Sequence, residues 1–428
     1  MRSTPLFYIS TTAIATLIAG LVALNFVPKE KKIDTNLVHQ YSASDPQFRR
    51  SLSVLLGPSI VEGNKVEALL NGDEIFPSML AAIRGARESI TMETYIYWSE
   101  TIGQEFSDAL MERARAGVKV HLMLDFIGSM KMDDTSLDAL HAAGVQVQRY
   151  HKPVWWKLTR LNNRTHRKVM VVDGKIGFTG GVGIADKWRG HGEDENHWRD
   201  SHFRVEGPVV GQIQAVFTDN WTKSTGVVLD GPLYFPKLAP VSEGDGLAAQ
   251  MFSSSPTGGS ESMHLMYLMA ITAATKSIDL SSAYFVPDDL TIKALVTAAK
   301  RGVKIRIITP GKIIDSKVVR VASRESWGDL LKAGIAIAEY QPTMFHVKAM
   351  VVDSLLVSVG STNFDNRSFS LNDEANLNVM DPAFARSQGA VFEADWARAK
   401  PITLAQWENR SWTEKLAGEA AALVGGQL

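Results

Sequence analysis

The chain has 428 residues, 45% hydrophobic and 21% charged, which excludes a disordered tail or a coiled coil and leaves room for two or three domains. Its 45 Lys and Arg nearly balance 46 Asp and Glu, which argues against a globally basic nucleic-acid-binding protein. The absence of cysteine excludes disulfides, thiolate metal sites and cysteine nucleophiles.

The first predicted element is an apolar helix from Leu6 to Val27, which carries no charge. At 1.5 Å per residue it would extend about 33 Å, enough to cross a hydrocarbon layer of roughly 30 Å. A cleaved signal peptide is the alternative, but such peptides have a shorter apolar core and a small-residue cleavage site. We therefore expect residues 1–32 to form a retained single-pass anchor. Arg2 and the amino terminus precede the helix, and Lys29, Lys31 and Lys32 follow it. By a margin of one or two charges, the positive-inside rule favours a globular part on the cytoplasmic side, with the reverse orientation left open.

The rest of the chain contains two related halves. Lys168–Asp173 matches Lys348–Asp353 without a gap, and a histidine precedes each match by the same spacing. Such an internal repeat predicts two copies of one folding unit, which we place at residues 33–245 and 246–428.

Within each half, strands and helices are expected to alternate. The first half is predicted to contain a strand at 90–97, a helix at 103–116, a strand at 118–124 and a helix at 137–143. The second half is predicted to contain a strand at 278–285, a helix at 290–301, a strand at 303–309 and a helix at 330–333. This alternation favours a parallel or mixed sheet covered by helices. Glycine and serine clusters between residues 241 and 259 predict loops at the join.

Each half carries a His-x-Lys motif followed by four residues and an Asp. The two sets are His166, Lys168 and Asp173, and His346, Lys348 and Asp353. On a strand, residues i and i+2 share a face, so the His and Lys of each copy should project together. The Asp has the opposite parity at the strand end, and we interpret it as structural.

A His beside a Lys suits an anionic phosphate substrate. The ammonium supplies a point charge to a phosphate oxygen, and the imidazole can attack phosphorus or donate a proton near neutral pH. Two pairs therefore predict attack by one His and protonation of the leaving oxygen by the other, without a metal or other cofactor. A single pair would most often be an ordinary surface pair. Two copies favour catalysis, since small-residue turns follow both: Gly180–Gly183 and Gly360–Asn363.

The paired motifs resemble the signatures of the phospholipase D superfamily. Two longer phrases, Trp198–Pro208 and Gly360–Glu374, are similar to those of bacterial cardiolipin synthases. The resemblance covers about residues 60–400. It implies an α/β fold of two pseudo-symmetric αβα sandwich halves with mixed β-sheets and one shared site, preceded here by an N-terminal transmembrane helix.

The resemblance also implies roles for individual residues. His166 is the expected nucleophile and His346 the general acid, with the reverse assignment left open. Four residues are expected to hold the phosphate oxygens: Lys168, Lys348, Ser361 and Asn363. Asp173 and Asp353 belong to the family signature and are counted with the catalytic set.

Two carboxylates are expected to support the histidines. By resemblance, Asp200 and Glu374 would each orient the His of the other half; the alternatives are a surface charge for Asp200 and a turn cap for Glu374. Gly183 departs from the family pattern, which usually has Asn there, so one amide donor is missing or replaced.

By the same resemblance, the expected activity is a phosphatidyltransferase that makes cardiolipin and glycerol from two phosphatidylglycerol molecules through a phosphohistidine, with phosphatidylethanolamine as another candidate lipid. The expected location is a bacterial inner membrane. The alternatives are a hydrolytic phospholipase D and a catalytically silent lipid-binding protein. We expect no nucleic-acid partner and no metal, because the one cluster of candidate ligands is irregularly spaced. That cluster comprises His191, Glu193, Asp194, Glu195, His197 and His202.

Overall fold

The computed structural model describes residues 33–152, 163–241, 246–256 and 262–422, together with Thr12, Thr16 and Gly20. The expected anchor therefore lies, apart from those three residues, outside the described residues. Across the described part of the chain, no helix has the length and apolarity needed to cross a membrane.

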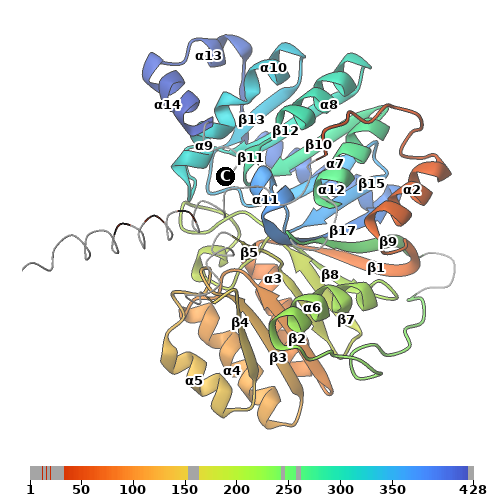
Figure 1. Ribbon diagram of the computed structural model, residues 1–428, viewed down its shortest axis with the longest axis vertical. Coiled ribbons are helices and arrows are strands. Elements are labelled where there is room, and N and C mark those ends of the chain that lie inside the picture. The colour runs from red at the N-terminus through yellow and green to blue at the C-terminus, as the bar shows by residue number, and fades with distance from the viewer. Residues whose placement is uncertain are drawn as a thin grey trace, which may run out of the picture.

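One 16-stranded mixed sheet runs through both halves of the molecule (Figure 1). In the first half its path is β1 (Val61–Leu70), β8 (Ser201–Glu206), β7 (Ile176–Gly180), β6 (Val169–Val172), β2 (Ser89–Thr94), β3 (Lys119–Asp125) and β4 (Gln146–Tyr150). In the second half it is β9 (Leu247–Ser254), β17 (Asn372–Met380), β15 (Leu356–Gly360), β14 (Lys348–Val352), β10 (Ser277–Ser282), β12 (Lys304–Pro310), β13 (Ala336–Tyr340) and β18 (Ala399–Ile402). Apart from β18, the two orders correspond strand by strand, so the pseudo-symmetry holds.

The prediction of loops at the join of the halves is partly wrong. Residues 247–254 form β9, which pairs antiparallel with β1 on one side and with β17 on the other. Both flanks of β9 are rich in Gly and Ser, and this composition masked a short, almost entirely buried strand. The two expected sheets are consequently joined edge to edge into one.

Helices cover both faces of the sheet, as an αβα sandwich requires. In the first half, α3 (Asn71–Gly85), α4 (Thr101–Arg115) and α5 (Asp134–Ala142) share a core on one face, and α6 (Val210–Thr225) packs on the other. Along β6, Met170 and Val172 enter the first core while Val169 and Val171 enter the second. In the second half, α7 (Ser262–Ala273), α8 (Asp289–Lys300) and α10 (Trp327–Lys332) face α12 (Pro382–Ala397) across the sheet.

The segment before β1 packs on the second half. Asp45 caps helix α2 (Pro46–Leu56), because its side chain accepts the backbone N–H of Gln47. The apolar face of α2 contributes Phe48 and Leu52 to the second-half core. The boundary between residues 245 and 246 therefore separates the strands of the two halves, but not the whole core.

Two expected strands are shorter than predicted. The strand expected at 90–97 ends at Thr94, and the one expected at 278–285 ends at Ser282. In the second case Phe285–Val286 forms a separate strand, β11, which pairs with β16 (Phe364–Asp365). In both halves the chain thus leaves the sheet after the strand that pairs with the strand following the His-Lys motif, β6 or β14.

Candidate active site

The two His-Lys pairs come from opposite halves and lie at the line where the halves meet. Each His lies in an extended segment just before its strand, rather than on the strand as expected, since β6 begins at Val169 and β14 at Lys348. The other half holds each segment: the backbone N–H of His166 donates to the carbonyl of Asp373, and that of His346 to the carbonyl of Arg199, both at 2.8 Å.

Each imidazole also contacts a buried carboxylate of the other half. His166 Nδ1 lies 3.0 Å and 3.1 Å from the two oxygens of Glu374, and His346 Nδ1 lies 2.7 Å from Asp200 Oδ2. Both carboxylates have no solvent exposure. These are the crossed contacts that we expected. An ionised carboxylate at Nδ1 makes that nitrogen the donor and leaves Nε2 as the nitrogen available for chemistry.

The two lysines are buried beside the histidines. Lys168 Nζ donates to the carbonyl of His166 at 2.8 Å, and Lys348 Nζ donates to that of His346 at 2.7 Å. Burial lowers the pKa of Lys168 to about 7 and that of Lys348 to about 8. A phosphate diester between them would favour their charged forms and occupy their remaining N–H donors.

Both histidines are neutral at neutral pH. Burial, opposed by Glu374 and reinforced by Lys168, lowers the pKa of His166 to about 4. Burial and the Lys348 charge likewise lower the pKa of His346. A neutral imidazole has a lone pair at Nε2, which in His346 lies 3.2 Å from Lys348 Nζ. An arriving anion would raise the affinity of each imidazole for a proton. The arrangement can therefore supply both a nucleophile and a proton carrier.

Asp173 and Asp353 lie away from this centre, at the far ends of β6 and β14. Asp173 accepts the backbone N–H groups of Arg87, Glu88 and Ser89, and Asp353 accepts those of three residues in the equivalent place, Thr275, Lys276 and Ser277. Each also begins a tight hairpin turn with positive φ, 52° for Asp173 and 53° for Asp353. The geometry fits our structural interpretation and does not support counting them with the catalytic set.

One residue of the turns after the motif strands is used differently from our expectation. Ser361 Oγ donates to Glu374 Oε2 at 2.5 Å, so this hydroxyl is occupied by the carboxylate rather than turned to a phosphate. Asn363 is buried, and its side-chain oxygen has no hydrogen-bond partner among the described residues. At Gly183 an added Cβ would lie 2.9 Å from Ile96 Cβ and 3.1 Å from the Trp188 ring, so an Asn would need both to move.

Comparisons with known proteins agree with the resemblance found in the sequence. A family model described as "Cardiolipin synthase, PLD-like domain" matches residues 79–221 and 267–396. The chain belongs to this family. It is 34% identical to Cardiolipin synthase A of Pseudomonas fluorescens over 84% of this chain and 74% of that protein. It is 35% identical to Cardiolipin synthase of Geobacillus kaustophilus over 84% of this chain and 72% of that protein.

Solved structures show the same fold at low identity. Phosphatidylserine synthase of Haemophilus influenzae aligns with a TM-score of 0.68 and 13% identity, over 89% of this chain and 100% of that one. Polyphosphate kinase of Porphyromonas gingivalis aligns with a TM-score of 0.55 and 12% identity, over 94% of this chain and 58% of that one.

Aromatic side chains that our motif search did not single out surround both imidazoles. The edge of Tyr95 packs on His166 at 5.2 Å between ring centroids. Trp188 and Trp198 pack on His346 at 5.3 Å and 5.5 Å. Trp198 begins one of the phrases that resemble the family, whereas Trp188 and Tyr95 carry no signal in a single sequence. Aromatic rings thus pack against both imidazoles.

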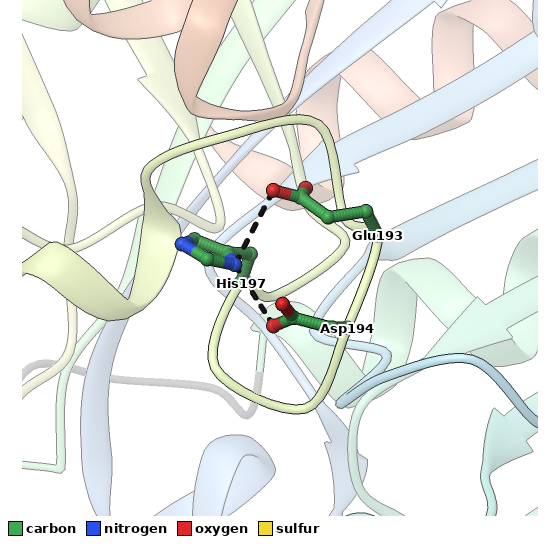
Figure 2. A group of neighbouring side chains, drawn as sticks. All are labelled: Glu193, Asp194 and His197. Carbon is green, nitrogen blue, oxygen red and sulfur yellow. Dashed lines mark hydrogen bonds and ion pairs between the residues drawn. The ribbon is translucent and has the colours of Figure 1, made fainter.

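Three of the six candidate ligands, for which we expected no metal, lie together on an exposed loop. Figure 2 shows Glu193, Asp194 and His197, whose ligand atoms lie within 4.8 Å of one another. Asp194 contacts His197 Nδ1 at 2.8 Å and accepts the backbone N–H of Asn196. Glu193 accepts the backbone N–H of His191. The group therefore braces the loop that leads to Trp198 and Asp200.

Proposed function

We propose that this chain is a phosphatidyltransferase that condenses two phosphatidylglycerol molecules into cardiolipin and glycerol. The observation that carries the proposal is the pair of crossed His–carboxylate contacts, each beside a buried Lys, at the meeting line of the halves. The names of the relatives support the same reaction and substrate class.

In the first step, His166 Nε2 attacks the phosphorus of one lipid. The P–N bond forms as the bond from phosphorus to the glycerol oxygen breaks, and His346 gives that oxygen its proton. Glu374 at Nδ1 stabilises the positive charge that develops on His166, and the two lysines bind the non-bridging oxygens. The phosphate anion raises the pKa of His346, which is low in the empty site, and so allows it to carry the proton.

In the second step, the free hydroxyl of a second lipid replaces glycerol. His346 removes its proton as the new P–O bond forms and the P–N bond breaks, which regenerates His166. Further positive charge lies at the same edge, since Arg164 and Arg367 both act electrostatically on Tyr95, which contacts His166. A second anionic headgroup is compatible with that charge.

The test is turnover of the full chain in vesicles of labelled phosphatidylglycerol. Cardiolipin and glycerol in equal amounts are expected, with no product from a His166→Ala variant. Phosphatidic acid without cardiolipin would establish the hydrolase instead. Lipid binding without any turnover would establish the silent lipid-binding protein. Replacing phosphatidylglycerol with phosphatidylethanolamine as the donor determines whether the leaving alcohol matters.

We also propose that Leu6–Val27 anchors the enzyme in the inner membrane with its catalytic part in the cytoplasm. The support is the uncharged run in the sequence and the location of both lipid substrates in a bilayer. Membrane fractionation of the full chain and of a chain lacking residues 1–32 tests the anchor. Protease protection in spheroplasts tests the orientation, because a cytoplasmic catalytic part is protected and a periplasmic one is cleaved.

A further inference from the structure

Besides its imidazole, each orienting carboxylate accepts a short hydrogen bond from a side chain, and the two donors differ chemically. Asp200 also accepts the backbone N–H of Ser201 at 2.8 Å, and Glu374 also accepts the Asn372 amide at 3.4 Å. Ser361 Oγ donates to Glu374, which orients His166. On the other side, Trp188 Nε1 donates to Asp200 Oδ2 at 2.9 Å, and the same oxygen contacts His346 Nδ1. An indole N–H thus takes the place of a hydroxyl.

Two glycines explain why the donor differs between the halves. In the aligned turns, Gly181 corresponds to Ser361 and Gly183 to Asn363. An added Cβ at Gly181 would lie 2.2 Å from Asp200 Oδ1, and one at Gly183 would lie 3.1 Å from the Trp188 ring. A Ser–x–Asn turn would therefore collide with Asp200 and with the tryptophan.

Trp188 occupies a well-defined place between these groups. It closes the 3₁₀ turn η3 (Asp186–Trp188) and is 1% exposed. Its ring packs edge-on against the His346 imidazole, with an interplanar angle of 81°, and against Trp198 at 4.7 Å. One side chain therefore contacts both the carboxylate and the imidazole that it orients.

We propose that Trp188 is a positioning residue that acts through Asp200 on His346, and that Gly181 and Gly183 are the two positions that make room for it. The proposal deepens the proposed function, since it rests on His346 as the proton carrier. It also assigns a reason to the missing Asn: the first half gives up an amide at the phosphate and gains an indole at the carboxylate.

Loss of the indole N–H should shift the pKa of His346 in a definite direction. A donor at Asp200 stabilises the carboxylate and weakens its pull on a proton at His346, so removing the donor raises the pKa of His346. The charged groups that act on His346 are Asp200, Lys348 and Asp315, and none of them changes in the experiment below. The high-pH limb of turnover, where His346 loses its proton, should therefore move upward when the indole N–H is lost.

The experiment compares Trp188→Phe with Trp198→Phe in the full chain on phosphatidylglycerol vesicles. Both variants keep an aromatic ring against His346, but only the first removes a donor to Asp200. Trp188→Phe should lower kcat roughly 10-fold with KM unchanged, and move the high-pH limb upward by about half a unit. Trp198→Phe should leave that limb in place.

A second measurement guards against loss of folding in Trp188→Phe. Fluorotryptophan incorporated at position 188 keeps the ring and makes the N–H a stronger donor, so the limb should move downward instead. The inference would be overturned if the high-pH limb of turnover fell at the same pH in wild type, Trp188→Phe and the fluorotryptophan protein. An inactive wild-type protein would overturn the proposed function, a distinct result.

Discussion

The two halves share their strand order and crossed imidazole contacts, but differ in the residue inside the His-x-Lys motif. In the first half it is Arg167, fully buried, which donates to the carbonyls of Val216 in α6 and Ser254 in β9. In the second half it is Val347, which packs in an apolar cluster with Tyr340 and Phe345. The His and Lys of the motif are therefore the same in both halves, while the residue between them differs with the core that it faces.

The same comparison applies around the imidazoles. A tyrosine and a serine-bonded glutamate surround His166, whereas two tryptophans and an indole-bonded aspartate surround His346. The proposed first step needs one histidine that attacks phosphorus and another that donates a proton. Different surroundings let each half take a different part of the reaction.

The largest expected effect comes from removing each histidine. His166→Ala and His346→Ala should each lower kcat by about 10³-fold or more, because a nucleophile or a proton carrier is lost. They should differ in one respect: with a labelled lipid and an acid quench, phosphohistidine is absent from His166→Ala and still forms slowly in His346→Ala. His141→Ala, which changes an exposed histidine of α5, is the matched control. The opposite pattern of trapping would exchange the two roles.

The carboxylates should give the next largest effect. Glu374→Gln and Asp200→Asn are each expected to lower kcat roughly 10- to 100-fold, because the imidazole loses its ionised partner. Since the contacts are crossed, Glu374→Gln should slow phosphohistidine formation and Asp200→Asn should slow proton transfer to glycerol. Rapid-quench measurement of both steps checks this assignment. Glu195→Gln, in the same loop as Asp200 but exposed and outside the Glu193–Asp194–His197 group, should retain nearly full turnover.

The two buried lysines should also change how the stability of the fold depends on pH. Burial leaves Lys168 with a pKa of about 7 and Lys348 with a pKa of about 8, against an ordinary 10.5. Between about pH 7 and 10.5 the unfolded chain binds protons that the folded chain does not, so the contribution of these lysines to stability rises with pH across that window. Lys168→Met should flatten the rise of Tm with pH, whereas Lys175→Met, an exposed lysine of the next hairpin, should not. Equal slopes in all three proteins would contradict a buried, proton-poor Lys168.

Much of this arrangement could be predicted because it repeats. A motif present twice located both His-Lys pairs, and the resemblance to the phospholipase D superfamily indicated the carboxylates that cross between the halves. The sequence could not locate β9, whose Gln and Ser residues lie between glycine-rich flanks and become buried only by pairing with both halves. It could not reveal Trp188 either, since that contact depends on how an irregular loop returns to Asp200. The direction of the Ser361 hydroxyl depends likewise on a strand partner, Ala375, whose backbone N–H donates to it.

The smallest effect on chemistry should come from the two motif aspartates, where the halves behave alike. Asp173→Asn and Asp353→Asn each weaken a carboxylate that accepts three backbone N–H groups, and each should cost about 1–3 kcal/mol of unfolding free energy. Turnover per folded molecule should change less than about 2-fold, because neither side chain contacts an imidazole. Thermal unfolding and kcat, measured on the same samples well below Tm, separate the two quantities. A large loss of kcat in a fully folded Asp173→Asn protein would contradict the purely structural role. It would mean that a change at the far end of β6 alters the position of the catalytic residues at the other end.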